Sequence, residues 1–288
     1  MLISDKWEDY ELLDASRGER LERWGSYTLV RPDPQVIWDA PRVRPEWKRP
    51  SARYARSSSG GGAWERRDKL PESWRIAYGK LRFNVKPMNF KHTGIFPEQA
   101  VNWDYAAGKI SALKRSLRLL NLFAYTGAAT VAAAAAGASV CHVDSARGMV
   151  AWARENAKLS GLEDAPVRWI VDDCGKFAER ELKRGRRYDA VIMDPPSFGR
   201  GPSGETWKLE DDLYRFVELV TRVLSDAPEF FIINSYTAGL SPATLTYIAD
   251  TLITRKFGGS AKSHELGLPV TETGLILPCG ASMRWERF

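Results

Sequence analysis

The stretch VIMDPPSFGRG at residues 191–201 combines residue types that could do chemistry where a strand ends. Its apolar start favours a buried strand, and Pro195 and Pro196 cannot donate to a sheet ladder, so the strand should stop at Asp194. Open α/β sheets bind ligands beyond the carboxyl ends of their strands. Asp194 is therefore a candidate for contacting a ligand, and the alternative is a strand-to-loop corner with a solvated aspartate.

Two other predicted strand ends carry acids of the same kind. Asp144 follows SVCHV, 17 residues after Gly127, which is about the spacing at which an acid binds ribose hydroxyls. Asp172 and Asp173 follow VRWIV. Each acid could instead be a helix N-cap. Together they predict an anionic rim that suits a cationic ligand without phosphates, such as S-adenosylmethionine, and suits NAD poorly.

The turn NLFAYTGAAT at residues 121–130 belongs to the same set. Asn121 begins it, Thr126 and Gly127 form the turn, and an alanine-rich helix follows. A glycine here allows the backbone to approach a ligand closely. The turn lacks the GxGxxG pattern, so alone it is a weak nucleotide-binding signal.

Strand and helix patterns alternate from about residue 97 onward, and these elements must position the candidate residues. Apolar runs predict strands at 118–123, 139–144, 167–173, 188–194, 229–235, 262–270 and 281–288. Helical patterns occur at 97–113, 127–137, 145–161, 176–185, 209–224 and 242–253. The alternation predicts right-handed βαβ units in a mostly parallel sheet, with the acids along one rim.

Four motifs, NLFAYTG, HVDSA, ENAKLSGL and DPPSFGRG, jointly resemble the class I S-adenosylmethionine-dependent methyltransferases. The resemblance covers roughly residues 85–288 and is specifically to the bacterial 23S rRNA large-subunit methyltransferases of the m5C1962 type. It implies an α/β, Rossmann-like fold, with a sheet of seven strands of which the last is antiparallel. Members of that family usually begin with a PUA domain. Here a small β-rich amino-terminal lobe would have to bind RNA instead.

The resemblance also implies roles for individual residues. Asp144 would bind the ribose hydroxyls and Asp173 the adenine amine, while Asn121, Thr126 and Gly127 would line the methionine portion. Asp194 would lie beside the reacting methyl group. In HTGIFPEQ, three further residues match positions that fold over the cofactor in relatives: Thr93, Phe96 and Gln99.

The expected nucleophile of the m5C chemistry is absent from the sequence. Methylation of cytosine carbon 5 requires a thiolate, but the segment NSYTAGL has Tyr236 where the resembled enzymes have a cysteine. Cys279 in LPCGA, which we expect in the loop between the last two strands, is the alternative nucleophile. The sequence therefore favours in-line transfer to a nitrogen or oxygen, with Asp194, Pro195, Pro196, Phe198 and Tyr236 presenting the acceptor.

The charge of the chain is divided unevenly. Residues 1–91 contain 19 Lys and Arg against 13 Asp and Glu, an excess of six, while the remainder contains 23 of each. Trp47, Tyr54 and Trp64 lie among the basic residues, a combination that suits RNA backbone and base contacts. We expect a flexible insert near residues 50–65, and a solvated loop without an RNA partner is the alternative for these residues. We therefore predict a basic β-rich lobe at 1–90, including β-like runs at 27–32, 35–40 and 75–85, and a methyltransferase domain at 91–288.

The remaining features limit the function further. No apolar run reaches the roughly 18 residues of a membrane span, and the amino terminus does not resemble a secretory signal. The cysteines and histidines have no metal-ligand spacing. We expect a cytoplasmic rRNA methyltransferase without metal, and the oligomeric state is not predicted. A protein or small-molecule methyltransferase and a non-catalytic RNA-binding protein that keeps the cofactor fold are the alternatives.

Overall fold

The computed structural model describes residues 1–57, 61–67, 70–113, 115–200 and 206–288. These residues form two compact units. The N-terminal unit comprises residues 2–101 and 266–279, and the C-terminal unit comprises Met1, 102–265 and 280–288. The division into domains at residues 1–90 and 91–288 stays a prediction. Within the flexible insert predicted near 50–65, residues 52–56 and 62–66 form paired strands. Residues 58–60 of that insert and 201–205 of the loop after Arg200 lie outside the described residues.

The C-terminal unit contains a mostly parallel sheet. Its strands are β9 (Arg118–Leu122), β10 (Ser139–Asp144), β11 (Val167–Val171), β12 (Ala190–Met193), β15 (Phe230–Ser235), β16 (Ser260–Pro269) and β17 (Ile276–Glu286). The order is β16-β17-β15-β12-β9-β10-β11. Neighbours from β15 to β11 pair in parallel, whereas β17 runs antiparallel to β15. The predicted α/β sheet with an antiparallel last strand is confirmed.

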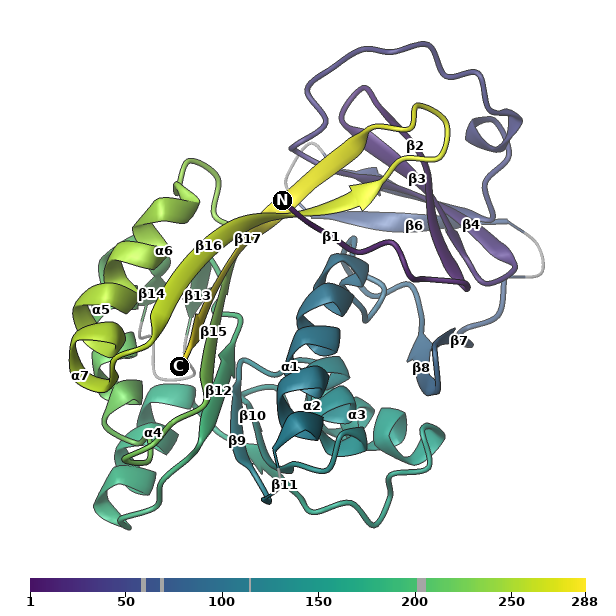
Figure 1. Ribbon diagram of the computed structural model, residues 1–288. Coiled ribbons are helices and arrows are strands. Elements are labelled where there is room, and N and C mark those ends of the chain that lie inside the picture. Colours follow the sequence, from purple (N-terminus) through teal and green to yellow (C-terminus); the bar gives the residue numbers. More distant parts are fainter. Residues whose placement is uncertain (58–60, 68–69, 114, 201–205) are drawn as a thin grey trace. The chain divides into compact units, whose positions relative to one another are not determined.

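Both faces of this sheet are covered by helices (Figure 1). The helices are α1 (Ala100–Ala112), α2 (Ala128–Ala135), α3 (Arg147–Leu159), α4 (Cys174–Lys183), α5 (Leu209–Thr221), α6 (Pro242–Ala249) and α7 (Arg255–Phe257), with a π-helical turn η3 (Asp250–Thr254). One apolar core packs α4, α5 and α6 against the sheet, and a second packs α1 and α2. Buried strands covered on both faces explain the continuous apolar runs in the sequence. Among the described residues no helix is long and apolar enough to cross a membrane.

The N-terminal unit is rich in β-structure. A five-stranded sheet contains β2 (Tyr10–Ser16), β3 (Glu19–Trp24), β4 (Tyr27–Pro32), β5 (Ala52–Arg56) and β6 (Gly62–Arg66). The strands β7 (Trp74–Tyr78) and β8 (Leu81–Val85) form a hairpin, and β1 (Leu2–Ile3) pairs with β16 as an eighth strand of the larger sheet. The N-terminal unit also contains two 3-10 turns, η1 (Pro45–Trp47) and η2 (Pro97–Gln99). In the C-terminal unit, β13 (Phe198–Arg200) and β14 (Thr206–Lys208) form a separate hairpin.

The strand predicted at residues 35–40 was wrong. Asp33 starts a turn in which its carboxylate accepts from the amide of Gln35 and its carbonyl accepts from Val36. An aspartate that bonds to the backbone two residues ahead favours a turn over a strand. Ile37 therefore lies in irregular structure with 90% of its surface exposed.

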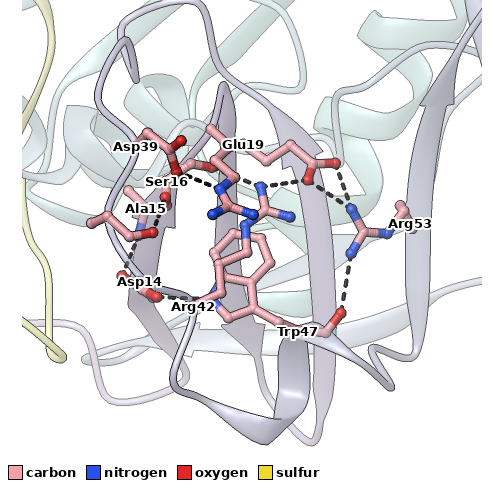
Figure 2. A network of polar contacts seen from close by, with 10 residues as sticks. Asp14, Ala15, Ser16, Glu19, Asp39, Arg42, Trp47 and Arg53 are labelled. Carbon is pink, nitrogen blue, oxygen red and sulfur yellow. Dashed lines mark hydrogen bonds and ion pairs between the residues drawn. The ribbon is translucent and has the colours of Figure 1, made fainter.

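Part of the basic stretch in this unit is neutralised by the unit itself (Figure 2). Glu19 accepts from Arg42 at 2.8 Å and from Arg53 at 2.6 and 2.7 Å. The guanidinium of Arg42 also lies 4.0 Å from the ring centre of Trp47, whose indole donates to Asp14. Arg42 and Arg53 therefore stabilise the sheet, so their charge does not indicate an RNA partner.

A second charged cluster is fully inside the N-terminal unit. The carboxylate of Glu22 accepts from both forks of Arg31 at 2.5 and 2.7 Å and from the Tyr10 hydroxyl at 2.8 Å, and Arg20 lies 3.4 Å away. Burial raises the pKa of Glu22, but Arg20 and Arg31 outweigh that effect and lower the pKa to about 2. The inward-facing charge explains why the sequence did not predict strands β2 and β3.

We predict that Glu22→Gln lowers the free energy of unfolding in urea by about 3–5 kcal/mol at neutral pH, because buried Arg31 loses its counter-charge and Arg20 keeps only Asp33, at 3.6 Å. The folded pKa of Glu22 is about 2, against about 4.3 in an unfolded chain. Its contribution is therefore present above about pH 4 and is lost as the pH falls toward 2. The variant should show a flatter acid dependence in that window, whereas exposed Glu65→Gln should match the wild type. Equal stability of Glu22→Gln and wild type would contradict this account.

Candidate active site

The predicted acids lie at one edge of the C-terminal sheet. The amide of Asp172 donates to the carbonyl of Asp144 at 3.0 Å, and the amide of Asp194 donates to the carbonyl of Leu122 at 3.4 Å. These contacts join the ends of β10 and β11, and of β9 and β12. Because the four strands are parallel, their carboxyl ends and the acids after them share that edge.

Asp144 organises the edge through two backbone contacts. Its Oδ2 accepts from the amide of Tyr125 at 2.8 Å, and its Oδ1 accepts from the amide of Ala146 at 2.9 Å. The side chain is half-buried. Burial raises the pKa of Asp144, and the two amide donors oppose that rise without cancelling it. The carboxylate thus couples the β9 turn to the β10 end.

The turn after β9 has an unusual backbone. Phe123 and Tyr125, which are not glycines, both adopt positive φ, at 53° and 51°, and Gly127 follows at 81° as the N-cap of α2. Such conformations cost about 1–3 kcal/mol each for side chains other than glycine and cluster at functional sites. Neither Phe123 nor Tyr125 is a typical turn residue, so these conformations could not be predicted from the sequence.

Packing also requires a glycine at position 127, a constraint that the sequence did not reveal. A Cβ at this position would lie 2.6 Å from the Cβ of Ala153, so the missing side chain is what allows α2 to begin against α3. The neighbouring carbonyl of Thr126 accepts from the buried Asn156 amide at 2.8 Å. The turn is therefore fixed from the helix side as well as by Asp144.

Asn121 lies within β9, before that turn, and its side chain points into the core. Its amide donates to Thr130 at 2.9 Å, and Thr130 lies 3.0 Å from Nδ1 of His142. All three side chains are buried. Burial lowers the pKa of His142 to about 3, with Arg154 adding to the effect, so the imidazole is neutral. A role for Asn121 toward the methionine portion stays a prediction.

Asp173 is the N-cap of α4, where its Oδ1 accepts from the Lys176 amide at 2.9 Å. The side chain is exposed. Asp172 instead pairs with Arg180. The helix-cap alternative therefore applies to Asp173, and its adenine role stays a prediction.

The DPP corner is tied to the loop after β15. Thr237 Oγ1 donates to Ser197 Oγ at 2.7 Å, and the Trp207 indole donates to the carbonyl of Pro196 at 2.6 Å. Pro195 is buried, whereas Phe198 has 54% of its surface exposed. The structure therefore brings together the two loops from which the sequence predicted acceptor contacts.

Aromatic side chains border this corner. The ring of Phe123 lies 5.7 Å from Trp207 and 5.3 Å from Phe216, measured between ring centres. Tyr236, on the loop after β15, packs against the backbone of Gly280, where an added Cβ would meet the tyrosine ring at 2.8 Å. Gly280 therefore fixes where the Tyr236 ring can lie.

Thr93, Phe96 and Gln99 belong to the N-terminal unit. Thr93 and Gln99 are buried, and Phe96 is the N-cap of η2, with its carbonyl accepting from the Gln99 amide at 3.0 Å. Their predicted closure over the cofactor stays a prediction.

The expected loop position of Cys279 was wrong. Cys279 lies within strand β17, because the connection from β16 closes earlier, at residues 270–275. Its Sγ is buried and donates to the Leu277 carbonyl at 3.4 Å. Burial raises the pKa values of Cys279 and Cys174 well above the usual range, and it raises that of Cys141 to about 11. All three cysteines are therefore neutral thiols at physiological pH.

The fold and this strand edge define a Rossmann-like methyltransferase. Residues 48–239 match the model of the S-adenosylmethionine-dependent methyltransferase family, so the chain belongs to that family and its cofactor is S-adenosylmethionine. The half-buried carboxylate of Asp144 and the left-handed Gly127 fit a cofactor with a ribose and no phosphate.

Solved structures and curated proteins agree with this assignment. A crystal structure of a SAM-dependent methyltransferase from Agrobacterium tumefaciens is 36% identical, with a TM-score of 0.93 over 99% of this chain and 92% of that one. A putative methyltransferase complexed with SAH shares the fold at 20% identity, with a TM-score of 0.71 over 98% of this chain and 76% of that one. The ribosomal RNA large subunit methyltransferase K/L of Chromohalobacter salexigens is 31% identical over 65% of this chain. The chain spans about a quarter (24%) of that relative's length.

We predict that Gly127→Ala destabilises the protein by about 2–4 kcal/mol, because it adds a clash with Ala153 to the cost of a left-handed alanine. Gly137→Ala is the matched control, since Gly137 also has a positive φ but nothing lies within 4 Å of its added Cβ. Urea unfolding of both variants separates the two effects. A Gly127 variant no less stable than the Gly137 variant would show that the close approach of α2 and α3 is unimportant.

Proposed function

We propose that this methyltransferase modifies a base in RNA, with ribosomal RNA as the substrate, by in-line transfer of the methyl group to a nitrogen or oxygen. The observation that carries the proposal is the hydrogen bond between Ser197 and Thr237, which couples the DPP corner to the loop of Tyr236 beside the cofactor edge. Two loops held together in this way can present one flat acceptor to one methyl group.

The cofactor side of the proposal assigns a role to each predicted residue. Bound S-adenosylmethionine supplies an electrophilic methyl group on a sulfonium. Asp144 accepts hydrogen bonds from the ribose hydroxyls, since its carboxylate is already oriented by two amides. Asp173 accepts from the adenine amine. Asn121, Thr126 and Gly127 would hold the methionine portion, and Thr93, Phe96 and Gln99 would cover the cofactor.

The acceptor side needs position more than acid or base strength. In-line displacement requires the acceptor atom at about 3–3.5 Å from the methyl carbon. Asp194, or the carbonyls of Pro195 and Pro196, accept a hydrogen bond from the amine of the base and so direct its lone pair. Phe198 and Tyr236 stack on the ring. A base held this way is unpaired or flipped out of its helix.

The state of the thiols favours a heteroatom as acceptor. Carbon methylation of cytosine requires a thiolate that adds to the ring. Cys141, Cys174 and Cys279 are buried, and their raised pKa values keep them protonated. A buried neutral thiol is a poor nucleophile.

Two observations support RNA as the substrate. The similar curated proteins are named for the large ribosomal subunit RNA, although this chain covers only part of their length. The N-terminal unit has an open cleft of about 720 Å³, lined by polar and basic residues that include Ser26, Tyr27, Arg49, Ser51, Arg66 and Arg67. Unlike Arg42 and Arg53, these arginines border an open surface, as phosphate contacts require.

Deletion of the gene should remove one methylated nucleoside, with the methyl group on nitrogen or oxygen, from digested rRNA measured by mass spectrometry. Wild-type protein from a plasmid should restore the nucleoside, and Asp194→Asn should not. Loss of 5-methylcytidine would contradict the heteroatom assignment. An unchanged rRNA profile would contradict the rRNA substrate.

Cys279→Ser should leave the methylation rate within about twofold of wild type, because a protonated thiol buried in β17 takes no part in the chemistry. The matched comparison is Cys141→Ser, a substitution of another buried strand thiol. A loss of about 100-fold or more for Cys279→Ser alone, with thermal stability unchanged, would support covalent catalysis instead.

A further inference from the structure

The C-terminal unit has a second pocket that the methyl-transfer site does not use. Its volume is about 280 Å³. Four arginines and two hydroxyl-bearing residues contribute to its lining: Arg118, Arg168, Arg186, Arg187, Ser139 and Tyr188. A cavity of this size exceeds a single inorganic ion and approaches the lower end of ligand-binding pockets, at roughly 300 Å³.

The pocket lies at the opposite end of the strands from the cofactor. Arg118 and Ser139 are the first residues of β9 and β10, and Arg168 is the second residue of β11. Arg186 and Arg187 precede β12. These are the amino ends of the same four parallel strands whose carboxyl ends carry the acids, so the two sites are separated by the length of the strands.

One buried carboxylate organises the arginines. Glu181 on α4 is fully buried and accepts from the Tyr188 hydroxyl at 2.5 Å. It pairs with Arg168 at 3.1 Å, and Arg184 and Arg186 lie 3.2 and 3.9 Å from its oxygens. The single negative charge of Glu181 thus orients three guanidinium groups. The cluster of Glu181 and these three arginines keeps a net positive charge.

The remaining arginines increase the positive charge of the pocket. Arg187 donates to the carbonyl of Arg186, and among the described residues no carboxylate pairs with it. Arg118 is 3.8 Å from Asp189, a distance at the limit of an ion pair, and Asp189 also pairs with Arg115 at 3.3 Å. The side chains of Arg118 and Arg186 are 57% and 50% exposed, so their charged ends reach solvent.

We propose that this arginine pocket binds a backbone phosphate of the RNA substrate, an inference that rests on the proposed function. Planar guanidinium forks match phosphate oxygens bidentately. The half-exposed arginines border the pocket without sealing it, which suits a phosphate on a continuous chain better than an enclosed small molecule. A contact remote from the methyl group would add affinity and register without reading sequence.

The test compares Arg118→Gln/Arg187→Gln with wild type, using fluorescence anisotropy of a short labelled single-stranded RNA over a range of salt concentrations. The slope of log affinity against log salt should fall by about one for each arginine that contacts a phosphate. Affinity for S-adenosylhomocysteine, measured by calorimetry, should not change. Arg215→Gln/Arg222→Gln, which removes two exposed arginines on α5 and at its C-cap, is the control of matched charge and should leave the slope unchanged. Arg187→Gln alone serves if the double variant is unstable.

The outcomes separate this inference from the proposed function. If wild type binds RNA and the double variant has the same salt slope, the phosphate-binding role of the pocket is overturned. The proposal that RNA is the substrate is then unaffected. Failure of wild type to bind RNA overturns both. AMP and inorganic phosphate are titrated in parallel. If wild type binds either of them but not RNA, and the double variant loses that binding, RNA is overturned as the source of the phosphate.

Discussion

The Asp144 carboxylate holds the active-site edge together. By accepting from the amides of Tyr125 and Ala146, it fixes a strained turn on one strand to the end of the next. The contact with the Tyr125 amide compensates for the left-handed backbone at Tyr125. The same carboxylate is available to a cofactor because it is only half-buried. In the proposed function, structural and ligand-binding demands therefore meet at one side chain.

The edge is also connected laterally. The amide of Phe123 donates to Cys174 at 3.3 Å, the amide of Asp194 donates to the carbonyl of Leu122, and Ser197 bonds to Thr237. The first contact joins the turn after β9 to the start of α4, and the other two join the ends of neighbouring strands, so the loops that carry the predicted acceptor contacts are tied to the turn after β9. Methyl transfer depends on such positioning, because displacement at carbon needs alignment of three atoms.

Much of this edge could be predicted from the sequence, since acids after apolar runs mark the carboxyl ends of buried parallel strands. The direction of the Asn121 side chain could not be predicted. Strand alternation does not reveal that Thr130 and His142 lie on the side to which this side chain points. The positive φ of Tyr125 was equally hidden, since it depends on a tertiary contact with Asp144. In the N-terminal unit, β2 and β3 escaped prediction because Glu22 faces inward against Arg31. Proline and glycine in LPCGA suggested a loop where β17 is continuous.

Calorimetry of S-adenosylhomocysteine with wild type and Asp144→Asn tests the central claim most directly, with exposed Asp164→Asn as the control. Loss of charge-assisted hydrogen bonds to the ribose, at about 1.5–3 kcal/mol, should weaken binding roughly 10- to 100-fold in the Asp144 variant alone. Equal affinity of wild type and a folded Asp144→Asn variant would contradict the account.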